Sequence, residues 1–198
     1  MEPVIRPYRD ADYTGISRVC LLTALAGKDA TGVYSSDGLV ADIFARPYVL
    51  LEPELAFVVD DGQVSGYILG VADTRRFVER YRSEWLPGFA ARYERPSATT
   101  TPDEGMRHLG FTPERMLIDE VDEYPAHLHI DVLPHLQGSG LGRRLIETLV
   151  SSLRERGIRG LHLGLDPANT SAAAFYDHLG FQRLASGTPD EPLYGMVL

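Results

Sequence analysis

Residues 128–145 read LHIDVLPHLQGSGLGRRL, and this stretch decides the fold. Apolar residues alternate with polar ones from Leu128 to Leu133, which predicts a half-buried strand that stops before a proline. A glycine-rich loop follows, and leucines at helical spacing predict an amphipathic helix from Leu141 that Gly157 closes. A second alternating run at 161–165 predicts that the next strand lies parallel to the first, through a right-handed crossover.

The same periodicities place the other elements. Downstream we expect a helix from about Thr170 to Leu179 and a last strand at 193–197. Upstream we expect a strand at 4–7, a helix capped by Asp10 or Asp12, a short helix from 38 to 46, and a hairpin of strands 56–59 and 64–71. The pattern from 74 to 93 is helical but interrupted by Pro87-Gly88, and prolines divide 94–125 into loops and short helices. The prediction is one α/β domain over residues 1–198, with an insertion at about 72–124 over the sheet.

Composition places the chain among soluble globular proteins. It has 198 residues, of which 44% are hydrophobic and 24% charged. No run approaches the roughly 20 apolar residues that cross a bilayer, and the first residues carry charges where a signal peptide needs an apolar segment. The single cysteine, Cys20, excludes a disulfide framework and a multi-cysteine zinc site, and its helix face predicts burial. We therefore expect a cytoplasmic location and no membrane partner.

The charge is unevenly distributed. A formal net charge of −9 argues against non-specific binding of nucleic acid. Between Leu141 and Gly160, however, five arginines stand against two glutamates, a local charge of +3. This segment is suited to a specific anion, although Arg154, Arg156 and Arg159 are better explained as the polar face of the helix.

The loop at 137–142, QGSGLG, is the first motif with chemical meaning. Alternating glycines let the backbone turn tightly and approach a ligand closely. Their N–H groups, together with the start of the helix behind them, favour a phosphate or pyrophosphate, and Arg143 and Arg144 add positive charge. The loop matches neither the Walker loop nor the dinucleotide-binding fingerprint.

A second motif follows the next strand, NTSAAAFYDHLGF at 169–181. The two motifs together resemble the GNAT superfamily of N-acetyltransferases. The resemblance covers 128–184 and rests on Val-x-Pro at 132–134, Gln-x-x-Gly-x-Gly at 137–142, and Asn-x-x-Ala-x-x-Phe-Tyr-x-x-x-Gly-Phe at 169–181. It implies a mixed, mostly antiparallel sheet with a splayed central pair of parallel strands, flanked by helices.

A narrower resemblance is to the acetyltransferase-like domain of O-GlcNAcase enzymes. It is carried by Ile5-Arg6-Pro7, Ser65 to Gly70, Trp85-Leu86-Pro87 and Tyr124-Pro125-Ala126. It implies that the insertion covers the acceptor side of the site and that the segment of Trp85 faces the pocket, where Trp85 would contact the substrate.

The superfamily resemblance also implies acetyl-CoA as cosubstrate. Backbone groups of Ile130, Val132 and Leu133 would then contact the pantetheine arm, and a backbone N–H near Val132 would polarise the thioester carbonyl. The pyrophosphate would lie on the loop and the helix start, at Gln137, Gly138, Ser139, Gly140, Leu141, Gly142 and Arg143. Asn169, Ala172, Phe175 and Tyr176 complete the implied cofactor-binding set.

Tyr176 matches the tyrosine that in many members of the superfamily directs its hydroxyl at the coenzyme sulfur, where a phenol can act as general acid. Amine acetylation also needs a base. Asp131 and His129 share one face of the strand and are the candidates, with water as the third possibility. We expect Asp131 also to line the substrate site. His127, His129 and Asp131 alternate on one strand, but no other ligand cluster accompanies them, so no metal is expected.

The resulting hypothesis is an acetyl-CoA-dependent N-acetyltransferase that transfers acetyl directly to a primary amine. The alternative is a non-catalytic module of the same fold that binds acyl-CoA or a partner protein. Asp119, Glu120, Asp122 and Glu123 either attract a cationic acceptor or form a solvated acidic loop. The identity of the acceptor stays open, and the chain is expected to be a monomer or a homodimer.

Overall fold

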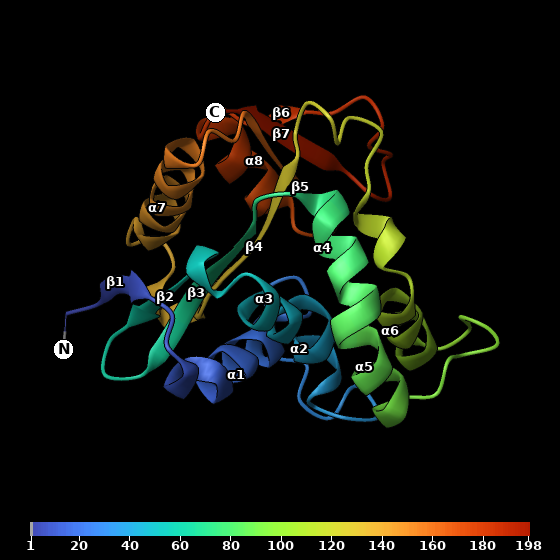
Figure 1. Cartoon of the computed structure of the whole chain (residues 1–198). Coiled ribbons are helices and arrows are strands. Elements are labelled where there is room, and N and C mark those ends of the chain that lie inside the picture. Colours follow the sequence, from blue (N-terminus) through green and yellow to red (C-terminus); the bar gives the residue numbers. More distant parts are fainter. Residues whose placement is uncertain (1) are drawn as a thin grey trace.

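The computed structural model describes residues 2–198, apart from the side chains of Thr170 and Ser171 (Figure 1). Its strands are β1 (Val4–Pro7), β2 (Ala56–Asp60), β3 (Val64–Val71), β4 (Ala126–Val132), β5 (Gly160–Gly164), β6 (Gln182–Arg183) and β7 (Leu193–Val197). Its α-helices are α1 (Tyr13–Thr23), α2 (Leu39–Phe44), α3 (Arg46–Leu51), α4 (Thr74–Arg80), α5 (Leu86–Arg92), α6 (Pro102–Phe111), α7 (Leu141–Glu155) and α8 (Thr170–His178). Shorter helical turns are η1 (Asp10–Asp12), η2 (Pro53–Leu55), the π-helix η3 (Tyr81–Trp85), η4 (Pro113–Met116) and η5 (Pro134–Leu136).

The strands form one sheet in the order β1-β2-β3-β4-β5-β7-β6. Every described pair is antiparallel except β4 and β5, which are parallel and are connected through α7. This arrangement confirms the predicted fold class, a mostly antiparallel mixed sheet with a central parallel pair between layers of helices.

Each face of the sheet supports its own hydrophobic cluster. On one face, Tyr67 and Leu69 of β3 pack with α1 to α5. On the other face, Ile68 of β3 and Leu128 of β4 pack with the leucine stripe of α7 and with Tyr176 of α8. Figure 1 shows α7 and α8 on the opposite side of the sheet from α1 to α6. The alternation along β4 therefore directs its odd-numbered side chains toward α1 to α6 and its even-numbered ones toward α7.

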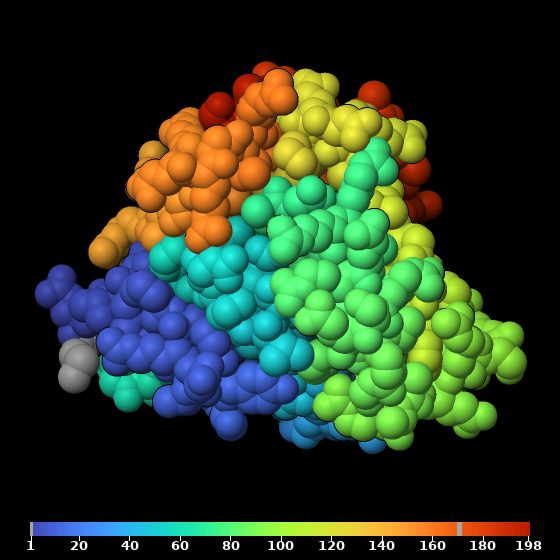
Figure 2. Space-filling view, viewed as in Figure 1, coloured from blue at the N-terminus to red at the C-terminus, as the bar shows by residue number. Residues whose placement is uncertain are grey.

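The segment between β3 and β4 carries α4, η3, α5 and α6. The predicted interruption at Pro87 is wrong, because α4 continues through the π-helix directly into α5. Pro87 lies in the first turn of α5, where a backbone N–H has no intrahelical acceptor to lose. In Figure 2 this segment, in green, forms one continuous surface with the helices that precede the hairpin.

Two local predictions near the N-terminus also need correction. Asp12 precedes α1, but its carboxylate makes no capping bond to the helix; it accepts from Arg6 at 2.6 and 2.8 Å and from the Arg9 N–H at 2.8 Å. The ion pair with Arg6 lowers the pKa of Asp12. The helix expected from 38 to 46 ends at Phe44 and a separate helix, α3, begins at Arg46, because Pro47 starts a new first turn.

Candidate active site

The parallel strands β4 and β5 pair only at their beginnings. Ala126 pairs with Leu161, and His127 pairs with His162. Beyond these two pairs, β4 and β5 are not paired with each other. β4 continues to pair with β3 as far as Val132, while β5 continues to pair with β7. The two strands therefore separate, as the family resemblance implied, and the second half of β4 presents an open edge.

The register decides which backbone groups this edge exposes. The Leu133 N–H donates to the Ser65 carbonyl at 2.9 Å, so odd-numbered residues of the strand direct their backbone groups to β3. Ile130 and Val132 consequently direct theirs to the opening beside β5. The Leu133 carbonyl accepts from Leu136 N–H at 2.9 Å, so both of its backbone groups are bonded within the protein. The predicted contact of Leu133 with a pantetheine arm therefore has no support in this geometry.

The glycine-rich loop joins the end of β4 to α7. Gly138 and Gly140 have φ of +74° and +82°, a conformation that L side chains rarely adopt. Within the described part of the chain, the backbone N–H groups from Gly138 to Arg143 donate to no protein acceptor. These groups surround the start of a helix of 15 residues, so they form a site that fits an anion.

The other loop residues have structural partners. Gln137 Nε2 donates to the Val132 carbonyl at 2.9 Å, and Ser139 Oγ donates to the Leu136 carbonyl. Leu141, the first residue of α7, is buried. A Cβ atom at Gly142 would lie 3.3 Å from the ring of Phe175. The third glycine thus allows α7 and α8 to pack closely. The side chain of Arg143 is exposed and lies in no ion pair of the described residues.

Tyr176 lies on α8, buried among Phe175, Phe181 and Tyr194. Asn169 begins this helix and accepts from the Ala172 N–H at 3.2 Å, which confirms the predicted cap. Among the described residues, the Tyr176 hydroxyl makes no hydrogen bond. Since no buried side-chain oxygen of these residues lacks a partner, the Tyr176 oxygen is not completely buried. Burial raises the Tyr176 pKa, and the nearby charge of Asp131 raises it further.

Asp131 lies on β4 directly opposite Tyr67 of β3. The Tyr67 hydroxyl donates to Asp131 Oδ2 at 2.5 Å, and Tyr67 itself is fully buried. Burial raises the pKa of Asp131 to about 6, although the hydrogen bond from Tyr67 opposes this rise. A carboxylate with this pKa is mostly ionised at neutral pH and is basic enough to accept a proton. Sequence reasoning missed Tyr67 as its donor, and only the strand register identifies it.

His129 occupies the same face of β4 as Asp131 but differs in charge. Its Nε2 lies 2.9 Å from the hydroxyl of Tyr48 on α3, and its ring meets Phe44 edge-on at 5.4 Å. Burial and the positive charge of Arg115 lower the His129 pKa to about 3. His129 is therefore neutral at physiological pH and is a much weaker base than Asp131.

Trp85 is the last residue of η3 and packs against α2. Its indole N–H donates to the Asp42 carbonyl at 3.0 Å, and the guanidinium of Arg92 lies over the ring at 5.2 Å. Only 8% of its surface is exposed. None of its described contacts involves Asp131, so the structure gives Trp85 a structural role, and its predicted role in substrate binding has no contact to support it.

The acidic residues before β4 are partly committed to other contacts. Glu120 accepts from the Ser186 N–H at 2.9 Å and from the Ser186 hydroxyl, and Asp122 pairs with Arg75 at 2.9 Å. These residues lie before the first residue of β4, whereas Asp131 lies near the last. At about 3.3 Å per residue, the strand keeps the acidic segment well away from Asp131.

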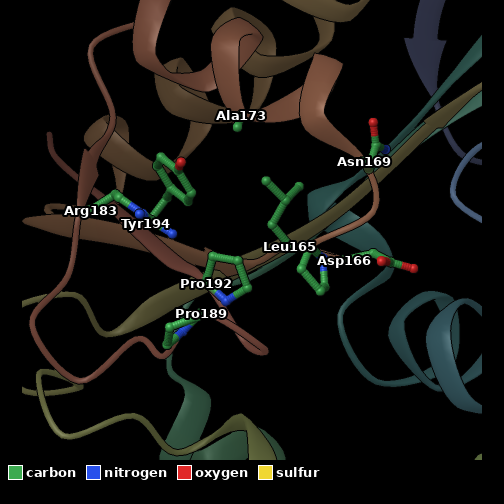
Figure 3. Close-up of a pocket in the computed structure, with 9 residues that line it drawn as sticks. Leu165, Asp166, Asn169, Ala173, Arg183, Pro189, Pro192 and Tyr194 are labelled. Carbon is green, nitrogen blue, oxygen red and sulfur yellow. The ribbon is translucent and has the colours of Figure 1, made fainter.

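A pocket of about 160 Å³ lies beside α8, at the ends of β5 and β7 (Figure 3). Its lining includes Asp166, Ala173, Arg183 and Tyr194. Asn169 also lines it and is one of the predicted cofactor-binding residues. Asp131, His129 and Tyr176 do not line it.

The described residues contain no group of three His, Cys, Asp or Glu side chains arranged to hold a metal ion. Likewise, no helix in the described part of the chain is long and apolar enough to cross a membrane. Cys20 is buried as expected, and burial raises its pKa to about 12.

Comparisons of the sequence and of the structure with known proteins lead to one family. The model described as acetyltransferase (GNAT) family matches residues 29–181. The crystal structure of SsHAT is 50% identical with a TM-score of 0.94, and the match covers 100% of this chain and 98% of that one. Protein O-GlcNAcase of Rattus norvegicus is 24% identical over 187 residues, 91% of this chain, which spans only 20% of that relative's length. The [ribosomal protein bS18]-alanine N-acetyltransferase of Escherichia coli strain K12 is 37% identical over 71 residues, 36% of this chain and 45% of that protein.

Proposed function

The chain belongs to the GNAT family of N-acetyltransferases, and on that premise we propose that it transfers acetyl directly from acetyl-CoA to a primary amine. The observation that carries the proposal is the separation of β4 and β5 beside a loop whose backbone N–H groups, from Gly138 to Arg143, have no acceptor among the described residues. We assign the two proton transfers to Asp131, near the end of β4, and to Tyr176 on α8.

Asp131 is the base. An alkylammonium must lose a proton before it can attack a thioester, and Asp131 accepts that proton directly or through water. Its pKa of about 6 keeps it ionised at neutral pH, and the hydrogen bond from Tyr67 fixes the orientation of its carboxylate.

Tyr176 is the acid. When the tetrahedral intermediate collapses, the carbon–sulfur bond breaks and the departing coenzyme A thiolate needs a proton. Burial raises the pKa of Tyr176, so the phenol keeps its proton at neutral pH and its hydroxyl is available to hydrogen-bond to the departing thiolate and supply this proton.

The coenzyme is assigned to the open edge and the loop. Backbone groups of Ile130 and Val132 at the opening are suited to the pantetheine arm and to the developing oxyanion. The N–H groups from Gly138 to Arg143 are suited to the pyrophosphate, and we assign Asn169, at the start of α8, and Ala172 and Phe175, on α8, to the same cosubstrate. Since the family acts on acetyl-CoA through this kind of opening, these residues fit the cosubstrate.

The proposal is tested by calorimetric titration with acetyl-CoA, followed by measurement of coenzyme A release with spermidine, kanamycin and a lysine-containing peptide. We expect saturable binding and release that depends on one of these amines. Binding of acetyl-CoA without release for any amine would support the non-catalytic module instead. Absence of binding would overturn the assignment of the loop.

A further inference from the structure

A series of buried hydrogen bonds lies against the face of β4 that carries Asp131. Thr74 Oγ1 lies 2.7 Å from the Pro125 carbonyl oxygen and 2.8 Å from His127 Nδ1. The Tyr48 hydroxyl lies 3.0 Å from His127 Nε2 and 2.9 Å from His129 Nε2. The side chains of Thr74, His127 and Tyr48 are buried. The series therefore joins a backbone carbonyl to His129, and the proposed function uses none of its members.

The number of protons fixes the direction of every bond. The Pro125 carbonyl can only accept, so the Thr74 hydroxyl gives its one proton to it. The proton between Thr74 and His127 must then sit on His127 Nδ1. Burial lowers the His127 pKa far enough to keep the ring neutral, so its Nε2 carries a lone pair.

The same argument continues to the end of the series. The Tyr48 hydroxyl gives its proton to His127 Nε2, because the other possible acceptor, the thioether of Met116 at 3.4 Å, is weak. His129 Nε2 must then be the donor to the Tyr48 oxygen. Since His129 is also neutral, its other nitrogen, Nδ1, carries a lone pair.

His129 Nδ1 is not completely enclosed by the protein. His129 makes no described hydrogen bond other than the one to Tyr48, and no buried side-chain nitrogen or oxygen in the described residues lacks a partner. His129 Nδ1 is therefore not fully buried. It lies on the same face of β4 as Asp131, two residues away, and Phe44 flanks the ring.

We propose that His129 binds the amine that is acetylated, accepting a hydrogen bond from its N–H through Nδ1, and that Tyr48, His127 and Thr74 are positioning residues that hold this tautomer. The inference rests on the proposed function and deepens it, because it names a residue that binds the amine and gives a reason why a primary amine is preferred to a secondary one. A primary amine has two N–H groups, one for Asp131 and one for His129, while its lone pair faces the thioester carbon. A secondary amine has a single N–H and leaves one of these two acceptors without a donor.

The tautomer is tested first, by nitrogen NMR of the histidine side chains in the whole protein. We expect His129 to carry its proton on Nε2 and to remain neutral from pH 5 to pH 8. In the Tyr48→Phe variant, which lacks the hydroxyl, we expect His129 to exchange between tautomers. A proton on Nδ1, or a charged ring in this pH range, would overturn the proposal without reference to any activity.

Two substitutions then separate binding from structure. Asn places a polar atom near the position of Nδ1 and loses the contact to Tyr48, whereas Gln reaches toward the position of Nε2 and loses the acceptor at Nδ1. We expect His129→Gln to raise KM for the amine about tenfold, with unchanged affinity for acetyl-CoA, and His129→Asn to raise it less. The reverse order would assign His129 a purely structural role.

The acceptor class is tested with a lysine-containing peptide and the same peptide methylated on Nε. We expect the methylated peptide to lose about tenfold or more in kcat/KM, and this discrimination to shrink in His129→Gln. Equal discrimination in both proteins would overturn the second contact. If the tautomer is as expected but no amine is turned over, the proposed function is wrong. The assignment of an amine as the ligand of His129 is then wrong as well.

Discussion

The Tyr67 hydroxyl donates to Asp131 Oδ2 at 2.5 Å, and the two residues are direct partners in the ladder between β3 and β4. The donor comes from the hairpin and the carboxylate from the strand that precedes the glycine-rich loop. The bond stabilises the ionised form of a carboxylate whose pKa burial has raised to about 6.

Asp131→Asn removes the base and keeps the shape of the side chain. We expect kcat to fall about 10²-fold or more, with unchanged binding of acetyl-CoA. In the wild-type protein, kcat should rise with pH through about 6, because Asp131 must lose its proton before it can accept one. The variant should lack this transition in a pH profile of kcat. Asp10→Asn, at an exposed carboxylate near the N-terminus, is the matched control.

Tyr67→Phe keeps the buried ring and removes only the donor to Asp131. Because the hydrogen bond from Tyr67 lowers the pKa of Asp131, its loss should move the transition in kcat above pH 6. The measurement is the same pH profile, with Tyr13→Phe on the surface of α1 as control. A transition that stays in place or moves downward would separate Tyr67 from the chemistry.

Tyr176→Phe tests the general acid. Loss of the hydroxyl should lower kcat about 10²-fold, with little change in the Kd for acetyl-CoA. Tyr194→Phe is the control, because Tyr194 packs in the same cluster with its ring 6.2 Å from that of Tyr176. If both variants retain wild-type turnover when chemistry limits the rate, Tyr176 has a packing role only.

Gly140→Asp tests the loop, because it places a carboxylate among the N–H groups at the start of α7. We expect binding of acetyl-CoA to be abolished through repulsion of the pyrophosphate, as measured by calorimetry. Gly157→Asp controls for backbone strain, since Gly157 has φ of +72° against +82° at Gly140 and both positions face open space. Similar losses of binding in both variants would point to strain and away from the anion site.

Asp42→Ala tests the buried carboxylate that holds Arg46 and Tyr93 beside Trp85. Asp42 is 1% exposed and accepts from Arg46 at 2.8 Å and from the Tyr93 hydroxyl at 2.9 Å. Its removal leaves these donors without their partner, so the free energy of unfolding should fall by about 3 kcal/mol in a denaturant titration. Asp122→Ala, which breaks an exposed pair with Arg75, should cost less than about 1 kcal/mol. Comparable losses in the two variants would contradict the role assigned to Asp42.

The sequence alone determined the fold around its strongest periodicities. The alternation at 128–133, the leucine stripe of α7 and the glycines at 138 and 140 all depend on neighbours in the chain, and the structure confirms each of them. The cap at Asn169 is equally local, since it satisfies an N–H three residues away. Such features are encoded within one turn or one strand, and for that reason a single sequence reveals them.

The tertiary structure decided which of the candidate side chains have suitable surroundings. Asp131 and His129 look alike as bases in the sequence. Burial, opposed by the hydrogen bond from Tyr67, raises the pKa of Asp131 to about 6, whereas burial and the charge of Arg115 keep His129 neutral. The indole of Trp85 turned inward to Asp42. The hydrogen bonds behind these outcomes join residues 43 to 81 positions apart in the chain, whose approach is set by strand register and helix packing. Protonation and burial are properties of such long-range contacts, so no local pattern could have assigned them.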